Sequence, residues 1–328
     1  MPLLCDVAIE RWPLAEPFEI AREVLTDIDT ICVRLTDAQG RVGRGEAVGV
    51  TYDGETPATL QAQIRSIGSS LPDDLGFDDL TSVLPPGGAR NALDCALWDL
   101  RARQASRRFW TLAGWHVVQP VTTVYTIGLG SETQVRRWVR AARHLPVLKL
   151  KADGLRHLDM VRIAREEHPT ARLLIDANQA WSPDLLERLL PALHAAGVEL
   201  IEQPLPRGQD EALDGLCSPI PLAADESCTD AASLQALVGR YQFANIKLDK
   251  CGGLSEALAM VRRAQVLGLK LMVGSMGGTS LGVAPAWLVA QVCTYVDLDA
   301  PLLLARDRHG GLQYDGALVP EPSVEFWG

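Results

Sequence analysis

Six apolar segments in the second half of the chain each end in charged or polar residues. They are LKLKAD (148–153), LLIDAN (173–178), ELIEQP (199–204), LAADES (222–227), ANIKLD (244–249) and YVDLDA (295–300). The residues Lys151, Asp176, Glu202, Asp225 and Lys247 follow one another at intervals of 22 to 26 residues. Such an interval is typical of one strand followed by one helix. The spacing therefore predicts repeated β/α units with polar side chains at the strand ends.

Three of these strand ends carry carboxylates, and a parallel barrel would gather them at one face. Burying Asp176, Glu202 and Asp225 together is unfavourable unless a cation neutralises them. Their hard oxygen ligands are of the kind that Mg²⁺ prefers. Each acid could instead be the N-cap of the next helix. Three consecutive acids with lysines on both sides favour the metal site over three separate caps.

The lysines suggest proton transfer at a carbon atom. Removing a proton next to a carboxylate creates a dianionic enolate, and a metal together with Lys149 could supply the positive charge it needs. Inverting a stereocentre requires a base on each face, which Lys151 and Lys247 could provide from different strands. We expect nearby positive charge to lower the pKa of Lys151 so that it can act as a base. Lys250 is interpreted as a solvated lysine.

A further pair of acids lies near the end of the last segment. Asp297 and Asp299 alternate, and alternate residues of a strand point to the same side. They would form a doubly anionic patch suited to an ammonium group. The alternative is a strand-end turn in solvent.

Length and composition limit the other possibilities. A chain of 328 residues suits one barrel of ~250 residues plus a smaller module. A net charge of -10 argues against nucleic acid and anionic membranes as partners. The seven cysteines include no C-x-x-C pair and are expected to be buried, reduced thiols of a cytoplasmic protein. The opening residues show no secretory signal.

One uncharged stretch, residues 271–296, is long enough to span a bilayer. Its glycines, its proline and its hydroxyl residues instead predict a strand, a turn and a buried helix. We therefore expect no membrane association.

The first hundred residues differ in pattern from the rest. Alternating stretches predict strands, and helical periodicity follows them, so this part is expected to be a separate α+β module. The strands are predicted at 3–11, 17–22, 28–36 and 41–48, and the helices at 56–69 and 88–106. The barrel begins with a strand at 121–127, and its helices are predicted at 132–143, 155–167, 182–196, 230–238, 254–267 and 280–291.

These patterns divide the chain into three parts. Residues 1–115 are expected to form a capping domain, residues 116–305 the barrel, and residues 306–328 a segment that returns to the capping domain. Within this last part, residues 312–322 resemble a short hairpin with Asp315 and Gly316 at its turn.

The ordered set LKLKAD, DAN, EQP, ADES, NIKLDKCGG and DLDAP closely resembles the dipeptide epimerases of the enolase superfamily, in the muconate-lactonizing-enzyme subgroup. The resemblance runs from RWPLAEPFEIA near the start to DLDAPLLL near the end. It implies an enolase-type (β/α) barrel, a modified TIM barrel, with an N-terminal α+β capping domain. The implied enzyme is a Mg²⁺-dependent isomerase that inverts the C-terminal residue of a dipeptide such as L-Ala-D/L-Glu, in the cytoplasm, in peptidoglycan peptide metabolism. Homo-oligomers are common among such barrels.

The resemblance also assigns roles to single residues. The implied Mg²⁺ ligands are Asp176, Glu202 and Asp225. The implied acid/base pair is Lys151 and Lys247, with Lys149 beside the substrate carboxylate. The implied substrate contacts are Asp297 and Asp299 for the α-ammonium group, together with Thr126, Ser275, Met276, Gly277 and Arg22.

Two loops of the capping domain, 19–29 and 47–55, are expected to select the substrate. After Arg22 the first loop reads EVLTDID, and the second contains Asp53 and Glu55. Acidic loops would favour a neutral or basic substrate side chain, whereas Arg22 could reach a glutamate carboxylate. Scattered acids can also be a solvated surface.

Three alternatives to epimerisation remain open from the residues. A muconate-type cycloisomerase or an o-succinylbenzoate synthase would use the same enolate chemistry without an ammonium site. The chain could also be a catalytically silent barrel that binds a metabolite or a partner. Such a barrel would be free to lose charges that are costly to bury, so the complete set of acids and lysines argues against it. A Schiff-base aldolase would be insensitive to chelators.

Overall fold

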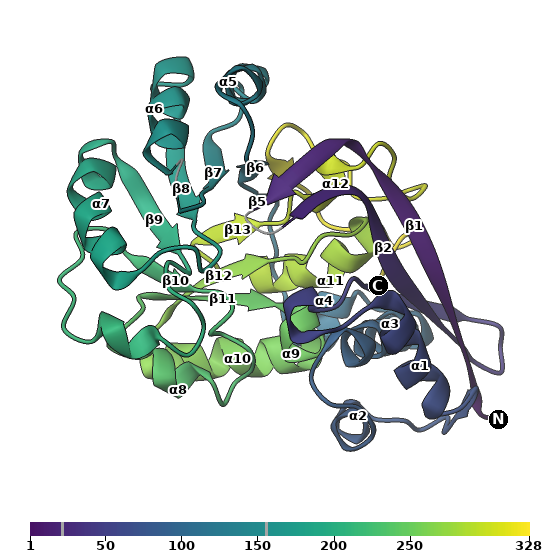
Figure 1. Cartoon of the computed structure of the whole chain (residues 1–328). Helices are drawn as coiled ribbons and strands as arrows, with labels where there is room; N and C mark the ends of the chain where they lie inside the picture. Colours follow the sequence, from purple (N-terminus) through teal and green to yellow (C-terminus); the bar gives the residue numbers. More distant parts are fainter. Residues whose placement is uncertain (21–22, 155–156) are drawn as a thin grey trace.

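The computed structural model describes residues 1–20, 23–154 and 157–328. A small antiparallel sheet with helices packs beside a parallel barrel, so the predicted α+β module and β/α barrel are both observed (Figure 1). The small sheet has the order β3-β2-β1-β4. Its strands are β1 (Leu3–Ile20), β2 (Glu23–Thr36), β3 (Val42–Ala47) and β4 (Ser70–Leu71). The helices of this part are α1 (Pro57–Ser66), α2 (Phe77–Val83), α3 (Gly88–Ala105) and α4 (Phe109–Leu112).

Close packing joins β3 to the long buried helix α3. A Cβ atom added at Gly45 would lie 2.0 Å from the carbonyl oxygen of Ala92, and one at Gly43 would lie 2.2 Å from that of Ala96. No side chain fits in that space, so two glycines let the strand backbone touch the helix. Leucine and isoleucine side chains from the sheet, α1 and α3 form a separate core here.

The structure corrects the prediction for the first strands. Residues 3–11 and 17–20 belong to one long strand, β1, with a register shift between Pro13 and Phe18, and positions 21–22 of the second predicted strand lie outside the described residues. The expected loop 19–29 is the tip of the β1–β2 hairpin, in which Ile20 pairs with Glu23. Cross-strand pairing of Arg11 with Asp29, joined by hydrogen bonds of 2.7 and 2.8 Å, supports this register.

The barrel contains eight parallel strands in sequential order. They are β6 (Tyr125–Ile127), β7 (Val147–Lys151), β8 (Arg172–Asp176), β9 (Val198–Glu202), β10 (Leu222–Ala224), β11 (Phe243–Lys247), β12 (Lys270–Gly274) and β13 (Tyr295–Asp297). A hydrogen bond of 2.8 Å from Val124 N to Val296 O links the first and last strands. One buried side chain from or beside each strand fills the barrel interior: Val124, Val147, Leu174, Leu200, Ala223, Phe243, Met272 and Tyr295.

Helices cover the outside of the barrel, where they share the largest hydrophobic core with the strands (Figure 1). They are α5 (Glu132–Ala141), α6 (His157–Glu167), α7 (Pro183–Ala195), α8 (Leu234–Leu237), α10 (Leu254–Leu267) and α11 (Ser280–Ala290). Two single-turn helices, α9 (Leu248–Cys251) and α12 (Ala300–Leu303), follow β11 and β13 at their carboxyl ends. The prediction for α10 is correct to the residue. The predicted helix at 230–238 is shortened to α8, because the Ser233 hydroxyl accepts hydrogen bonds from the amides of Thr229 and Asp230 in a turn.

Three buried acids hold the two parts of the molecule together. Glu46 of β3 accepts hydrogen bonds from the amide and the hydroxyl of Thr279 on the barrel. Asp94 of α3 accepts from the amide and the hydroxyl of Ser255 at the start of α10. Asp249 of α9 accepts from the amides at the start of the loop that follows β3. The capping domain is therefore fixed over the strand ends by specific buried contacts.

The junction makes a pH-dependent stability prediction. Burial raises the pKa of Asp94 from 3.8 to about 6, despite the hydrogen bonds from Ser255. The folded protein then binds a proton at Asp94 more readily than the unfolded chain, so this group lowers the free energy of unfolding as pH rises from about 4 to about 6. We expect Asp94→Asn to remove up to about 3 kcal/mol of this decline. Urea unfolding at several pH values would measure it, and Glu187→Gln, at an exposed position, should leave the slope unchanged.

The C-terminal segment runs back along the molecule. A tight turn forms at Asp315, where Asp315 and Leu318 exchange backbone hydrogen bonds of 3.0 Å. The expected hairpin at 312–322 is present only as this single antiparallel bridge. The strand that follows, β14 (Leu318–Val319), pairs instead with β5 (Val121–Thr122), which precedes the barrel. The last residues do reach the capping domain: Trp327 Nε1 donates to the carbonyl of Arg44 at 2.8 Å.

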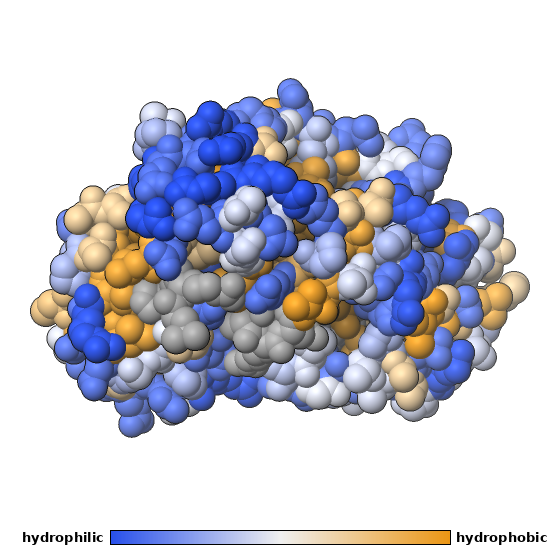
Figure 2. All heavy atoms as spheres, turned by 45° about the horizontal axis from the view of Figure 1, so that its top comes forward, coloured by the Kyte–Doolittle hydropathy of each residue, from blue (hydrophilic) through white to orange (hydrophobic). Residues whose placement is uncertain are grey.

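The surface and the cysteines agree with the composition. The face in Figure 2 is largely hydrophilic, with hydrophobic side chains in smaller areas. Within the described ranges, no helix has the length and apolar character needed to cross a membrane. All seven cysteines are free thiols, and four of them are buried.

Candidate active site

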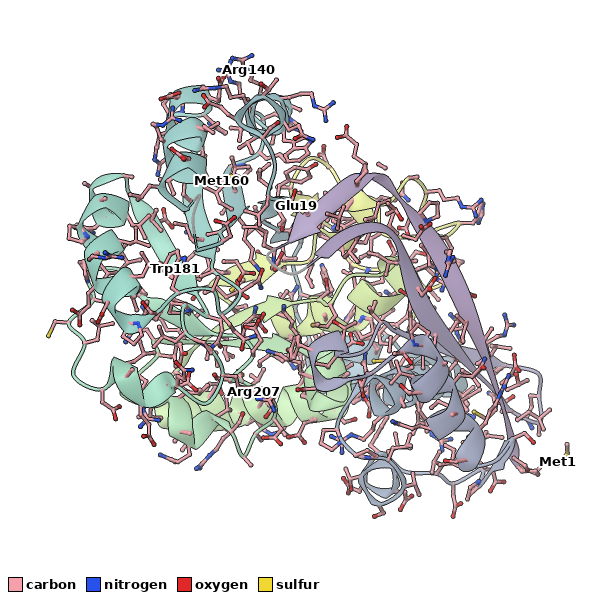
Figure 3. All side chains as sticks on the ribbon, in the orientation of Figure 1. Met1, Glu19, Arg140, Met160, Trp181 and Arg207 are labelled. Carbon is pink, nitrogen blue, oxygen red and sulfur yellow. The ribbon has the colours of Figure 1, made fainter. Side chains whose placement is uncertain are left out.

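A cavity of about 540 Å³ opens between the capping domain and the carboxyl ends of the barrel strands. The hairpin tip reaches over this end of the barrel, where the carbonyl of Glu19 accepts a hydrogen bond of 2.9 Å from Leu129 N (Figure 3). Most of the residues singled out in the sequence line the cavity: Thr126, Lys149, Lys151, Asp225, Lys247, Ser275, Met276, Gly277, Asp297 and Asp299. Asp176 and Glu202 lie deeper and are almost completely buried. Arg22 lies outside the described residues.

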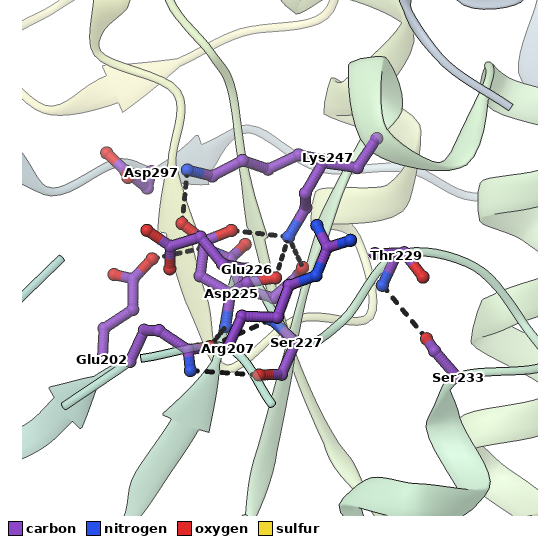
Figure 4. Close-up of polar contacts among 12 residues, drawn as sticks. Glu202, Arg207, Asp225, Glu226, Ser227, Thr229, Ser233, Lys247 and Asp297 are labelled. Atoms are coloured by element: carbon purple, nitrogen blue, oxygen red, sulfur yellow. Dashed lines mark hydrogen bonds and ion pairs between the residues drawn. The ribbon is translucent and has the colours of Figure 1, made fainter. Parts of the chain in front are cut away.

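The three carboxylates come from neighbouring strands. Asp176 ends β8 and pairs in register with Glu202, which ends β9. Asp225 follows β10, the next strand of the barrel. Figure 4 shows Glu202 and Asp225 facing the same space, and Asn245 Nδ2 orients Glu202 through a hydrogen bond of 2.7 Å to Oε1. Burial and the charge of Asp176 raise the pKa of Glu202 to about 8, as expected where acids are crowded in a buried site.

Lysine ammonium groups lie among these acids. Lys149 Nζ is 3.0 Å from Asp176 and 2.8 Å from Glu202, and Lys151 Nζ is 2.7 Å from Asp176. Lys247 Nζ is 2.7 Å from Asp225. With the lysines in these positions, no group of three or more acid, histidine or cysteine side chains among the described residues is arranged to hold a metal ion.

The donor set nevertheless fits a hard divalent cation. Three buried carboxylates on adjacent strands supply only oxygen ligands, which suits Mg²⁺. Two further oxygens nearby are buried without a hydrogen-bond partner in the described part of the chain: Asn178 Oδ1 and Glu226 Oε2. Buried oxygens of this kind normally find a partner. The site thus contains more hydrogen-bond acceptors than the lysine ammonium groups satisfy.

Lys151 and Lys247 lie on opposite sides of the barrel. Lys151 ends β7 and Lys247 ends β11, and these strands are four places apart in a barrel of eight. Both side chains line the same cavity. A carbon atom between them would have one ammonium or amine group on each face, which is the arrangement that inversion of a stereocentre requires.

The neighbouring acids control the charge of the buried lysines. Burial alone would lower the pKa of Lys149, but Asp176, Asp297 and Glu202 outweigh it and raise the pKa well above its usual value. The pKa of Lys247 is likewise raised, because Asp225 and the other acids outweigh burial. Lys149 is therefore a permanent cation in this arrangement, suited to binding an anionic oxygen.

The structure corrects the interpretation of Lys250. Its side chain is only 2% exposed, and its ammonium group lies 2.5 Å from Asp225 Oδ1 and 3.2 Å from the carbonyl of Asn245. The short helix α9 turns Lys250 back under the strand end instead of into solvent. Lys250 therefore orients Asp225 from behind, a role that an isolated lysine in a sequence does not reveal.

Asp297 and Asp299 form the predicted anionic pair, although not on one strand. β13 ends at Asp297, and Asp299 is the N-cap of α12. Asp297 Oδ2 is 2.7 Å from Lys149 Nζ, whereas Asp299 Oδ2 accepts a hydrogen bond of 2.6 Å from the amide of Thr126. Burial and the charge of Asp297 raise the pKa of Asp299 to about 7. A cationic ligand group would relieve this repulsion.

The acidic residues of the mouth are mostly neutralised. Asp29 pairs with Arg11, Asp53 pairs with Arg207 at 2.8 Å, and Glu55 accepts from the amides of Val50 and Gly88. These partners are distant in sequence or belong to the backbone, so the acids are not a free anionic surface. Asp27 also lines the cavity and has no ion pair within the described residues.

Some cavity residues were missed by the sequence reasoning. Phe18, Leu25 and Ile28 of the hairpin form an apolar wall, and the Tyr52 hydroxyl is buried beside the cavity without a hydrogen-bond partner in the described chain. Gln203 accepts hydrogen bonds from the amides of Asp225 and Ser227 and thereby fixes the turn after β10. The EQP triplet could have identified Gln203 from the sequence. Single apolar or aromatic residues in a loop belong to no motif, so the sequence gives no sign of their role.

Comparison with known proteins places the chain in a family. A family model of the N-terminal domain of mandelate racemase and muconate lactonizing enzyme matches residues 5–114, and one described as enolase C-terminal domain-like matches residues 131–316. The chain is 38% identical over 312 residues to the L-Ala-D/L-Glu epimerase of Escherichia coli, covering 93% of this chain and 95% of that protein. It is 39% identical over 289 residues to an N-acetyl-D-glutamate racemase of Pseudoalteromonas, covering 87% and 91%.

Solved structures agree with these relatives. An enolase family member from Agrobacterium tumefaciens with homology to dipeptide epimerases, solved with sodium and L-Ala-L-Glu, superimposes with a TM-score of 0.95 at 40% identity over all of both chains. A dipeptide epimerase of Methylococcus capsulatus, complexed with Mg and L-Arg-D-Lys, gives 0.91 at 31% identity and covers 98% and 97%. The enolase-type fold and the resemblance to dipeptide epimerases are thus confirmed. The chain belongs to the mandelate racemase and muconate lactonizing enzyme family of the enolase superfamily and is an isomerase of the racemase and epimerase type.

Proposed function

We propose that the protein is a Mg²⁺-dependent epimerase that inverts the α-carbon of the C-terminal residue of a dipeptide. One observation carries the proposal: a single cavity holds two lysines on opposite strands of the barrel and a pair of buried aspartates beside them. The lysines suit proton transfer on the two faces of a carbon atom. The aspartates suit the free α-ammonium group at the other end of a dipeptide.

In this reaction Lys149 binds the substrate carboxylate, while Asp297 and Asp299 hold the ammonium group. The α-carbon then lies between Lys151 and Lys247. One lysine removes the α-proton as a neutral amine, and the other, as an ammonium group, returns a proton to the opposite face. The roles of the two lysines exchange for the reverse reaction, so both epimers are substrates.

Asp176, Glu202 and Asp225 would hold the metal. Bound there, Mg²⁺ would supply positive charge both to these three acids and to the carboxylate oxygens of the substrate, which become more negative during proton removal. Asn245 and Lys250 would keep Glu202 and Asp225 in position through the hydrogen bonds described above. The Tyr52 hydroxyl is available to the bound substrate.

The preferred side chain of the inverted residue follows from the hairpin. The described wall is apolar, formed by Phe18, Leu25 and Ile28, with the anionic Asp27 beside it. These residues favour neutral or basic side chains. Arg22 is the single basic residue between positions 12 and 33 of the sequence, and a glutamate side chain would depend on it. L-Ala-D/L-Glu and dipeptides with neutral or basic C-terminal residues are therefore the substrates to compare.

A second candidate, racemisation of an N-acetylated amino acid, is favoured by the Pseudoalteromonas relative. An N-acyl group carries no charge and would offer Asp297 and Asp299 no cationic ligand group. A cycloisomerase substrate of the muconate type would do the same. The buried anionic pair is the reason to prefer the dipeptide.

Exchange of the substrate α-hydrogen in D₂O tests the proposal directly. We expect L,L-dipeptides incubated with the enzyme and Mg²⁺ to gain one deuterium in the C-terminal residue, and N-acetylated amino acids to gain it more slowly. EDTA should reduce labelling by at least about 100-fold, because several kcal/mol of charge stabilisation is lost, and added Mg²⁺ should restore it. Mass spectrometry gives the label. Labelling that resists EDTA, or labelling of N-acetylated amino acids alone, would contradict the proposal.

A further inference from the structure

A second cavity, of about 780 Å³, lies on the capping domain away from the barrel strand ends. It is bounded by β2, β3, the C-terminal end of α3 and the last residues of the chain. Six arginines line it: Arg34, Arg41, Arg44, Arg103, Arg107 and Arg108. Glu325 is the one acid that lines it among the described residues. Such a concentration of positive charge is unexpected in a chain with a net charge of -10.

Four of the arginines have structural partners. Arg44 donates to the carbonyl of Phe326, and Arg108 donates to that of Pro322, so both hold the C-terminal segment. Arg41 pairs with Asp37 at 2.7 Å, and Arg103 pairs with Asp99 at 2.9 Å. These contacts explain why the side chains are fixed, but only the two aspartates neutralise charge.

The other two arginines have no such partner. Arg34 and Arg107 are exposed and make no side-chain hydrogen bond or ion pair within the ranges that the structure describes. Arg34 of β2 lies directly opposite Arg44 of β3 in the strand pairing. Like charges in that position destabilise a sheet. Asp6, opposite Arg34 on β1, forms no ion pair with it.

Part of the positive charge around the cavity remains uncompensated. Burial lowers the pKa of Arg44, the charge of Asp99 raises it, and the charge of Arg103 lowers it again. Burial lowers the pKa of Arg108, and the charges of Glu321 and Glu325 partly oppose this effect. The protein thus maintains repulsion here that a bound anion would remove.

We propose that this cavity binds a small anion with several phosphate-type oxygens, such as a di- or triphosphate group. Guanidinium groups donate two parallel hydrogen bonds to phosphate oxygens and keep their charge at every physiological pH. The volume is in the range of ligand sites in proteins. The bound anion would connect β2, β3 and α3 with the C-terminal segment, at a site separate from the catalytic cavity.

Isothermal titration with inorganic pyrophosphate and with tripolyphosphate tests this assignment on the full-length protein in EDTA, so that no metal complex forms. We expect binding in the micromolar range that weakens as salt rises. The double variant Arg34→Ser/Arg107→Ser should bind at least about 10-fold more weakly and keep its isomerase activity. Arg65→Ser/Arg188→Ser changes the net charge equally at exposed positions outside the cavity and should bind like the unchanged protein.

Three results would overturn the proposal. The first is absence of binding at millimolar pyrophosphate. The second is equal loss of binding in both double variants, which would indicate a response to net charge alone. The third is tighter binding of citrate than of either phosphate compound, which would assign the cavity to carboxylates. A rise in the thermal midpoint with tripolyphosphate, lost only in the Arg34→Ser/Arg107→Ser variant, would support it independently.

Discussion

Lys151→Ala and Lys247→Ala are each expected to reduce the rate of epimerisation by at least about 1000-fold. In the proposed mechanism, each change removes one of the two groups that exchange a proton with the α-carbon, and positioned acid/base groups typically contribute 10²–10⁴-fold. The loss should appear in kcat, because Lys149 and the aspartate pair still bind the substrate. Polarimetry or chiral chromatography of the dipeptide products measures the rate.

The two variants should differ in a way that shows which lysine acts on which face of the α-carbon. When one lysine is absent, the other can still remove a proton from its own face and return a solvent deuteron to it. We therefore expect one variant to exchange the α-hydrogen of the L epimer without inversion, and the other variant to do so with the D epimer. Neither a loss of substrate binding nor a loss of folding would produce this complementary pattern.

Lys270→Ala is a matched control, since Lys270 is an exposed lysine at the opposite end of a barrel strand. It should retain the activity of the unchanged enzyme. Normal epimerisation in both active-site variants would eliminate the two-base mechanism. Loss of exchange with both epimers in both variants would argue instead that the lysines only maintain the site.

The strand-end residues could be predicted because the barrel determines where they converge. Regular spacing from Lys151 to Lys247 defines the β/α units, and the carboxyl ends of parallel strands meet at one face whatever the loops do. The apolar residues between them alternate between the barrel interior and the helix layer, which sequence periodicity also shows. These features depend on local pattern and on one topological rule.

Other features depend on partners that are far apart in sequence. Asp29 and Asp53 were expected to give the mouth an acidic character, yet Arg11 and Arg207 neutralise them. The Arg207–Asp53 pair joins residues 154 positions apart. Sequence spacing contains no information about the Arg207–Asp53 pair, because this pair forms only when the capping domain lies over the barrel.

Local backbone geometry accounts for the remaining differences. Lys250 is buried because α9 is a single turn that ends at Gly252 in a left-handed conformation. Asp299 reaches the cavity from a helix N-cap and not from the strand. The rule that alternate strand residues share a side placed both aspartates correctly, although only Asp297 belongs to the strand.

Asp299→Asn gives the second large expected effect, a fall of about 100-fold in kcat/KM for dipeptides. The amide oxygen can still accept the hydrogen bond from Thr126, so the turn is preserved and only the negative charge is lost. Removing one member of a buried charge pair costs 2–5 kcal/mol, which corresponds to roughly 30-fold or more. An N-acetylated amino acid has no ammonium group, so the rate of its slower reaction should be the same in Asp299→Asn as in the unchanged enzyme.

The pH dependence separates this charge from other effects of the substitution. Because the pKa of Asp299 is raised to about 7, the carboxyl is anionic above this pH and neutral below it. The value of kcat/KM for a dipeptide should therefore fall as pH decreases through about 7, and this limb should disappear in Asp299→Asn. Asp297→Asn should lower activity further, since Asp297 also contacts Lys149. If Asp299→Asn leaves both kcat/KM and the acidic limb intact, Asp299 does not bind the ammonium group, and the cycloisomerase and N-acyl racemase alternatives become the better explanations of the cavity.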